Sequence, residues 1–490
     1  MPIMKPERIF DRDADWRALV SFVEHAVPEP ALGVVSGRRR QGKTYLLTAL
    51  AEETGGFYFG ADESTGAEAL RLFGAALARF TGAPASIMFA GWDDALDHFF
   101  SLARERPIPL IIDEFPLLMK ASPELPSILQ RHLDRRWHVD REPCFARVLL
   151  CGSAMSVMGR LLAGQAPLRG RAGLELVVKP LRYRSAAAFW GADDPGLAAL
   201  LHAVVGGTPA YGRQFVRNDT PGGPADFDDW VCRTVLNPQT PLFREARYLL
   251  AEEVEARDPG LYHSVLGAIA AGNATNGGIA AYVGRKSAEI AHPLHVLEDC
   301  QLIVKDRDLI QRKKPVYRIA EPLITFYQAV MRPRWAALEL GEAERVWRGS
   351  KPRFLSQVVG PDFEQICRDW AILADDFFDE PPGEVGSALL VDHSRRENNK
   401  IQLDVVVMTP ALLEERQRVL SLGEVKWDKV MGLGHLERLR RARDLLIAQG
   451  HRAEDAVLAC YSGAGFDKDL RAEAHRDRQV LLVDLPILYG

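Results

Sequence analysis

A glycine-bounded loop early in the chain has the residue types and spacing of a phosphate-binding loop. Its residues are Gly37, Arg38, Arg39, Arg40, Gln41, Gly42, Lys43 and Thr44, in the pattern G-x-x-x-x-G-K-[ST]. An apolar stretch precedes it and Tyr45-Leu46-Leu47 follows, so we expect a buried strand before the loop and a helix beginning at Lys43. The glycines let successive N–H groups face a phosphate, and the helix N-terminus adds its positive dipole end. The sequence therefore predicts a nucleoside triphosphate site.

The side chains of this loop suit a triphosphate bound with Mg²⁺. We expect the Lys43 ammonium to reach the β- and γ-phosphates and the Thr44 hydroxyl to hold the metal ion. ATP and Mg²⁺ are therefore the expected cofactors. The other residues expected at the nucleotide in this stretch are Gly37, Arg38, Arg39, Arg40, Gln41, Gly42 and Tyr45.

A pair of acids ends a second apolar run further along the chain. Pro109-Leu110-Ile111-Ile112 is followed by Asp113 and Glu114. A parallel strand buried on both faces is expected to be continuously apolar, and acids at its carboxyl end lie beside the phosphates. We expect Asp113 to serve the Mg²⁺ shell and Glu114 to polarise the water that attacks the γ-phosphate.

Three further segments carry a nucleotide role beside a plainer alternative. Ser153 follows the strand candidate 147–152 and either senses the γ-phosphate or caps the next helix. Arg169 and Arg171 follow in a glycine-flanked loop, where either arginine stabilises phosphoryl-transfer charge or is simply solvated. Near the start of the chain, Phe10 and Arg12 either neighbour the adenine or belong to a surface helix.

Composition limits the classes of protein to consider. A chain of 490 residues accommodates about three domains. The formal net charge of -5 excludes a protein that is basic throughout, so any nucleic-acid surface must be local. Six cysteines without a C-x-x-C pair, and no signal peptide, argue for a reducing cytoplasm and against a disulfide framework or zinc site. No apolar run is long enough to span a membrane, and we expect a cytoplasmic protein.

Five segments in a fixed order carry a family resemblance. They are G-R-R-R-x-G-K-T, I-I-D-E-F, C-G-S, P-L-x-G-R and, in the helical stretch after residue 183, G-G-T-P-x-Y. Together they resemble the archaeal and bacterial ATPases of the signal-transduction (STAND) branch of AAA+-type P-loop proteins, which are related in layout to origin-recognition ATPases. The resemblance implies an α/β core, a helical lid, and a turn at Gly206, Gly207 and Pro209 that couples nucleotide state to the next domain. Pro209 is counted among the nucleotide-site residues.

The middle of the chain has the pattern of a winged helix. Helices are expected at 261–271, 278–284 and 287–300, followed by a hairpin whose turn contains Arg312, Lys313 and Lys314. In a DNA-docking module the third helix enters the major groove and the wing contacts phosphate. Acidic residues on the third helix, Glu289 among them, equally favour a spacer or a protein-contact module. DNA contact here remains one of two alternatives.

The last part of the chain carries a second set of reactive residues. We expect a helix at 362–373, strands at 388–392, 400–408 and 420–427, a helix at 430–448 and further strands at 456–461 and 480–484. Strict alternation places Ile401, Leu403, Val405 and Val407 on one face of their strand and Asp404 on the other. In the next strand, Glu424 and Lys426 are two residues apart and therefore share a face.

The D…E-x-K arrangement and the helix–three strands–helix–strand order resemble the PD-(D/E)xK restriction-endonuclease-like superfamily. That resemblance implies that Asp404 and Glu424 hold Mg²⁺, or Mn²⁺, against a scissile phosphate while Lys426 activates water. Glu364, in the leading helix, matches a further acid of such sites. The chain departs from the pattern at Gln402, where members often have an acid. An ion pair on an exposed strand is the alternative explanation of E-x-K.

The expected fold is thus multidomain α/β. Its parts are an AAA+-like P-loop core with residues 1–180, a helical lid with 181–258, a winged helix with 259–335 and a restriction-endonuclease-like domain with 336–490. The expected function is an ATPase acting on DNA, in which nucleotide state controls a metal-dependent nuclease, in DNA defence or maintenance. The alternative is a non-cleaving nucleotide-dependent switch or scaffold with a degenerate nuclease-like domain. A homo-oligomer or protein partner is left open.

Overall fold

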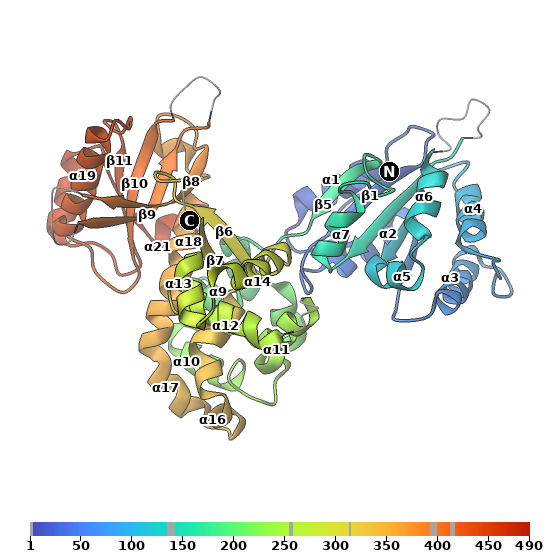
Figure 1. The fold of residues 1–490 in the computed structure, drawn as a ribbon, viewed down its shortest axis with the longest axis horizontal. Coiled ribbons are helices and arrows are strands. Elements are labelled where there is room, and N and C mark those ends of the chain that lie inside the picture. The colour runs from blue at the N-terminus through green and yellow to red at the C-terminus, as the bar shows by residue number, and fades with distance from the viewer. Residues whose placement is uncertain (1–2, 135–142, 254–257, 313–314, 393–398, 412–416) are drawn as a thin grey trace. The chain divides into compact units, whose positions relative to one another are not determined.

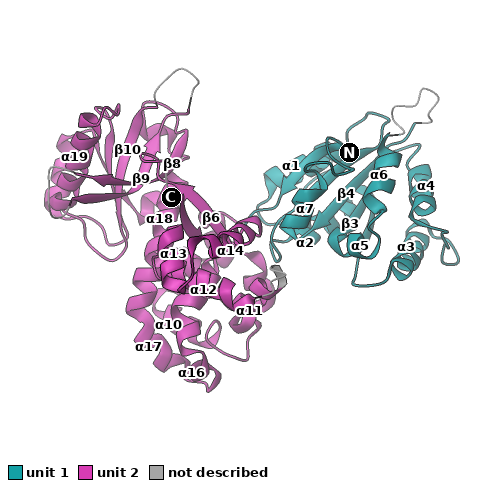
Figure 2. Ribbon diagram, in the orientation of Figure 1, with its two compact units in different colours: residues 1–180 teal, residues 181–490 magenta. Residues whose placement is uncertain are grey.

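The protein forms two compact units, Met1–Pro180 and Leu181–Gly490, which are coloured separately in Figure 2. The computed structural model describes residues 3–134, 143–253, 258–312, 315–392, 399–411 and 417–490 (Figure 1). Within these residues no helix has the length and apolar character needed to cross a membrane.

The first unit is built on a parallel sheet with the strand order β2-β3-β4-β1-β5. Its strands are β1 (Ala31–Ser36), β2 (Phe57–Gly60), β3 (Ile108–Asp113), β4 (Ala146–Gly152) and β5 (Ala172–Val177). The helices are α1 (Asp13–Val23), α2 (Lys43–Thr54), α3 (Gly66–Thr81), α4 (Trp92–Leu102), α5 (Phe115–Ala121), α6 (Leu125–Asp134) and α7 (Met155–Leu161). The continuous apolar run of β3 is explained by burial on both faces, because Leu110 and Ile112 enter the core with α3 and α4 whereas Ile111 enters the core with α1 and α2.

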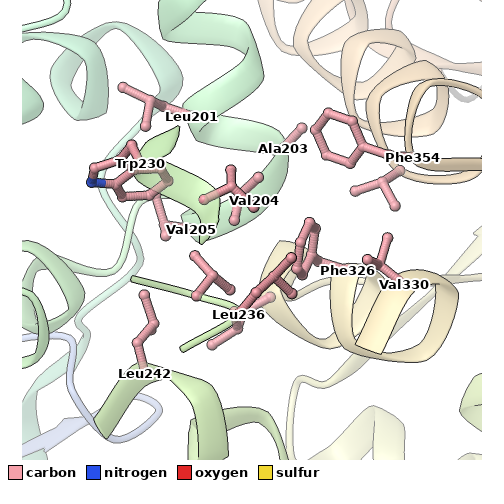
Figure 3. Packing of buried hydrophobic residues seen from close by; sticks show 14 of the residues in the cluster. Leu201, Ala203, Val204, Val205, Trp230, Leu236, Leu242, Phe326, Val330 and Phe354 are labelled. Atoms are coloured by element: carbon pink, nitrogen blue, oxygen red, sulfur yellow. The ribbon is translucent and has the colours of Figure 1, made fainter. Parts of the chain in front are cut away.

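Helices from widely separated segments of the second unit share one apolar core, part of which is shown in Figure 3. Leu201, Trp230, Phe326 and Phe354 all pack in it. The helices that contribute are α8 (Tyr183–Trp190), α9 (Pro195–Val205), α10 (Phe227–Arg233), α11 (Pro241–Glu253), α15 (Pro322–Phe326), α16 (Trp335–Glu339) and α17 (Ala343–Phe354). Residues 320–359 therefore complete the core of the expected lid. The domain boundaries that the sequence suggests inside residues 181–490 stay predictions.

The segment expected to form a winged helix contains three helices and a hairpin. These are α12 (Pro259–Ala270), α13 (Asn276–Val283), α14 (Ser287–Asp299) and the antiparallel strands β6 (Ile303–Arg307) and β7 (Pro315–Ile319), arranged around their own core. The hairpin turn begins with residues 308–312, which we call the wing segment. Lys313 and Lys314, which the sequence placed in the wing, lie outside the described residues.

The last sheet has the order β12-β11-β10-β9-β8, with β8–β9–β10 antiparallel and β10–β11–β12 parallel. Its strands are β8 (Glu384–Val391), β9 (Lys400–Met408), β10 (Val419–Lys426), β11 (Val457–Ser462) and β12 (Val480–Asp484). Helix α18 (Gly360–Ala371) packs on one face and α19 (Leu433–Ala448) on the other, because each contributes to a different apolar core. The chain continues with α20 (Lys468–Arg476) and α21 (Leu485–Tyr489).

The wing segment is bound to the edge strand of this last sheet. The Leu309 N–H donates to the Ser387 carbonyl at 3.1 Å, and the Leu389 N–H donates to Asp308 Oδ2 at 2.7 Å. Gln311 Nε2 donates to the Leu389 carbonyl at 2.7 Å. Residues 308–311 of this hairpin thus satisfy backbone groups of β8, and contact of the hairpin with phosphate stays one of the two alternatives.

Candidate functional site

The loop between β1 and α2 has the backbone that its glycines predict. Gly37 adopts φ 146° and Gly42, which caps α2, adopts φ 87°. A Cβ on Gly37 would lie only 2.4 Å from the Val178 carbonyl oxygen, so a larger residue would push the loop away from the end of β5. The loop is thus fixed by close packing as well as by its own conformation.

Lys43 is buried and points back into the loop. Its Nζ donates to the Gly37 carbonyl at 2.6 Å and to the Arg38 carbonyl at 2.9 Å. Arg12 braces the same loop from outside, donating to the Gln41 carbonyl at 3.1 Å and to the Lys179 carbonyl at 2.7 Å. The sequence left Arg12 either beside the adenine or in a surface helix. In the structure its guanidinium donates to these two carbonyls, and a role at the adenine stays a prediction.

The Asp113 carboxylate lies beside the loop and receives several hydrogen bonds. Its Oδ2 accepts from Thr44 Oγ1 at 2.7 Å and from the Tyr58 hydroxyl at 2.8 Å, and its Oδ1 accepts from the Glu114 N–H at 2.9 Å. Burial alone would raise the pKa of Asp113, but hydrogen bonds from Cys151, Thr44, Tyr58 and the Glu114 N–H outweigh it, so the pKa lies below its usual value. The carboxylate is ionised at neutral pH, as an Mg²⁺ site requires.

Glu114 and Ser153 also meet at this edge of the sheet. Glu114 has φ 51° and caps α5, which turns its side chain toward the end of β4. Ser153 Oγ donates to its two carboxylate oxygens at 3.4 Å and 3.3 Å. Because β4 lies between β1 and β3, Ser153 follows a strand placed between the loop and Asp113. Its role at the γ-phosphate stays a prediction.

Two predicted residues of the first unit make no contact with this cluster that we observe among the described residues. Arg171 makes a two-pronged ion pair with Asp134, at 2.8 and 2.7 Å. Tyr45 lies on α2 with 46% of its surface exposed. Pro209 belongs to the second unit. Their nucleotide roles stay predictions. Tyr58, by contrast, contacts Asp113 and was missed by the sequence reading.

In the last sheet the structure brings Asp404, Glu424, Lys426 and Glu364 together. Lys426 Nζ lies 3.1 Å from Glu424 Oε1 and 4.0 Å from Asp404 Oδ2. Burial and the neighbouring Asp404 charge raise the pKa of Glu364 to about 7, and burial raises the pKa of Asp404 too. The group therefore has the composition and crowding of a cation-binding or proton-sharing site.

A β-bulge at Asp404 corrects one expectation. The alternation predicted that Ile401, Leu403, Val405 and Val407 share a face, and this is wrong. The first two pack in the core with α19, whereas the last two pack in the core with α18. The pairing of β8 with β9 shifts register at this point. Bulges of this kind re-aim a side chain, and here that side chain is Asp404.

Two arginines that the sequence reading missed complete this group. Arg368, one turn after Glu364 on α18, donates to Glu364 Oε2 at 3.0 Å and to the Asp404 carbonyl at 2.8 Å. Arg438 on α19 lies 3.4 Å from Glu424 Oε1. Glu364 and Arg368 are four residues apart on one helix, a spacing that predicts their pairing. No local pattern predicts that Arg438 meets Glu424.

The donor set fits a divalent cation that prefers oxygen. Glu424 is buried, and among the described residues its Oε2 has no hydrogen-bond partner. Asp404 Oδ2 accepts from the Val425 N–H at 3.0 Å, which orients that carboxylate toward β10. Asp404 and Glu424 thus offer carboxylate oxygens beside Lys426, and their binding of Mg²⁺ or Mn²⁺ stays a prediction.

Known proteins resemble the chain at moderate to low identity. No protein-family model matches it. An uncharacterized protein of Methanocaldococcus jannaschii is 26% identical over 345 residues, which cover 69% of this chain and 72% of that protein. A Walker-type ATPase of Pyrococcus abyssi is 20% identical with a TM-score of 0.51, covering 67% of this chain and 98% of that one. The ORC2 protein of Aeropyrum pernix is 16% identical with a TM-score of 0.39, covering 68% and 97%.

The Pyrococcus abyssi structure establishes the fold class. At a TM-score of 0.51 the chain shares the fold of a Walker-type ATPase, with the parallel sheet and phosphate-binding loop described above. The likeness to the ORC2 protein is too low to add to that conclusion.

Proposed function

We propose that this chain is an ATP-binding and ATP-hydrolysing protein of the AAA+ type, in the STAND branch, that acts on DNA. One observation carries the first part of the proposal. Lys43, Thr44, Asp113 and Glu114 lie together at the carboxyl edge of a parallel sheet, with Thr44 and Asp113 already 2.7 Å apart. The Walker-type ATPase fold of the first unit supports it.

The residues divide the work as follows. The loop N–H groups and the Lys43 ammonium bind the β- and γ-phosphates, and Thr44 and Asp113 hold Mg²⁺, which shields the phosphate charge. Glu114 orients the attacking water and accepts its proton, and Ser153 keeps that carboxylate in place through its hydrogen bonds.

We further propose that the last domain is a metal-dependent nuclease under the control of nucleotide state. The cluster of Asp404, Glu424 and Lys426 supports this, because two carboxylates and an ammonium suit hydrolysis of a phosphodiester. Glu364 assists as a further acid. In the second candidate function this domain binds DNA or protein without cutting, and the pairing of Glu424 with both Lys426 and Arg438 favours it.

Nucleotide binding is the first test. Lys43→Ala is expected to weaken Mg²⁺-ATP binding and slow hydrolysis by about 100-fold or more, since it removes the principal phosphate contact. Binding of a fluorescent ATP analogue and phosphate release measure the two effects. Lys120→Ala is the matched control, because Lys120 pairs with Glu63 on the surface of the same unit. Equal binding by Lys43→Ala and wild type would contradict the proposal.

Nuclease action is tested separately on linear, circular and single-stranded DNA, with Mg²⁺ or Mn²⁺ and with or without ATP. Lys426→Ala is expected to abolish cleavage, whereas Lys468→Ala, an exposed lysine of the same domain, leaves it unchanged. Loss of ATP-dependent control in Lys43→Ala would link the two sites. Intact ATP turnover without cleavage of any substrate would favour the non-cleaving switch.

A further inference from the structure

We propose that Tyr58 is a positioning residue of the Mg²⁺-nucleotide site, and that its hydroxyl holds the Asp113 carboxylate in place for the metal ion. The inference rests on the proposed nucleotide function. It concerns a residue outside the loop and outside the acidic pair that the sequence assigned to the site.

The geometry singles out one oxygen of Asp113. Oδ2 accepts two hydrogen bonds, from Thr44 Oγ1 at 2.7 Å and from the Tyr58 hydroxyl at 2.8 Å. Oδ1 accepts from the Glu114 N–H at 2.9 Å. A carboxylate offers about two acceptor sites on each oxygen, so Oδ2 is fully used by the two hydroxyl groups.

The strand order explains why a tyrosine reaches this carboxylate. β2 pairs in parallel with β3, and Gly60 lies opposite Asp113. Alternation along β2 sends Phe57 and Phe59 into the core with α3 and α4, while Tyr58 packs on the other face against the core that contains α2. The only hydroxyl in this short strand therefore lies on the face where α2 presents Thr44.

A bound metal ion would share Thr44 with Asp113. Thr44 would offer the ion a lone pair of its hydroxyl oxygen while its O–H can still donate to Asp113. The Tyr58 hydroxyl, which lies on β2 and outside the phosphate-binding loop, donates to Oδ2 without being a candidate ligand of the ion. Together with the Glu114 N–H on Oδ1, it holds the carboxylate in one orientation.

Outer partners that orient a metal-binding carboxylate tune its affinity for the metal ion. Without the Tyr58 hydroxyl, Asp113 would still be ionised and would still accept from Thr44, Cys151 and the Glu114 N–H. Its Oδ2 would, however, lose one of its two hydroxyl partners. The signature of the proposed role is therefore a changed Mg²⁺ requirement with unchanged affinity for nucleotide in the absence of metal.

The test is Tyr58→Phe in the full chain, which keeps the ring and removes only the hydroxyl. We expect the Mg²⁺ concentration for half-maximal ATP hydrolysis to rise by about tenfold. Binding of a fluorescent ATP analogue in EDTA is expected to stay within about twofold of wild type, which also shows that the variant is folded. Tyr282→Phe, an exposed tyrosine on α13, is the matched control and leaves both measurements unchanged.

Two outcomes overturn the inference. An unchanged Mg²⁺ requirement in Tyr58→Phe would show that the hydroxyl does not position Asp113. Equal losses of nucleotide binding in EDTA and in Mg²⁺ would show that Tyr58 supports the fold and not the metal shell. Failure of the proposed function is a distinct result, because then wild-type protein itself would bind no nucleotide with or without Mg²⁺.

Discussion

The two candidate sites of this protein use buried carboxylates in opposite ways. Asp113 is surrounded by donors, so hydrogen bonds hold its pKa below the usual value despite burial. Glu364 and Asp404 lie among other acids: burial and the Asp404 charge raise the pKa of Glu364 to about 7, and burial and the Glu424 charge raise that of Asp404. The carboxylate of the first site is ionised near neutral pH. At the second site, Glu364 is partly protonated at neutral pH.

The difference comes from the groups that face each acid. At the first site, Asp113 accepts from the Thr44 and Tyr58 hydroxyls and from the Glu114 N–H. At the second, two strands and two helices bring the carboxylates together, and cations such as Lys426 and Arg368 partly compensate the charge. Donors therefore outweigh burial at the first site, whereas burial dominates at the second.

Of the three substitutions, Glu364→Gln should produce the largest change in the pH dependence of folding stability. The pKa of Glu364 is raised from 4.5 to about 7. The contribution of this side chain to folding stability is therefore fully present below pH 4.5 and is lost as the pH rises through about 7. The variant should match wild type at pH 4.5 and be more stable by about 2 kcal/mol at pH 7.5, a value reduced because 29% of the side chain is exposed. Denaturant unfolding across this pH range measures it. A difference independent of pH would contradict the raised pKa.

Arg368→Met should give a smaller effect at the same site. It removes the cation between Glu364 and Asp404 together with two hydrogen bonds, at 3.0 and 2.8 Å. We expect a loss of about 1–2 kcal/mol in the free energy of unfolding at neutral pH. The loss should shrink at pH 5, where Glu364 is protonated. Arg345→Met, which removes an exposed pair with Glu342, serves as the control.

Of the three substitutions, Asp113→Asn should give the stability difference from wild type that depends least on pH. Its pKa is lowered, so the stabilisation is present above the unfolded value and lost only as the pH falls through the folded one. The stability difference from wild type should therefore be constant between pH 6 and 8, although Mg²⁺-dependent nucleotide binding is lost. Thermal unfolding at several pH values in this window checks it. If the stability difference for Asp113→Asn changed with pH as steeply as that for Glu364→Gln, the contrast between the two sites would be contradicted.

The parts that the sequence predicted are those that depend on local pattern. The loop from Gly37 to Thr44 and the acids at 113 and 114 are contiguous motifs next to apolar runs, and the structure joins them at one sheet edge. The pairing of Glu424 with Lys426 followed from their spacing of two in one strand.

The parts that it missed depend on neighbours distant in sequence. Tyr58 meets Asp113 because β2 lies beside β3, which alternation within 57–59 does not specify. The bulge at Asp404 depends on the register between β8 and β9. Arg438 reaches Glu424 only because α19 packs against β10. Each is a property of tertiary pairing, which no local pattern encodes.

The wing segment has a consequence for how the last domain behaves when separated from the rest. An edge strand with free N–H and C=O groups is a template for pairing with another molecule. Here Leu309, Asp308 and Gln311 occupy the outward groups of Ser387 and Leu389 on β8. A fragment beginning after the hairpin would expose that edge and should aggregate. The preceding module therefore covers part of the edge of β8 and protects it from pairing with another chain.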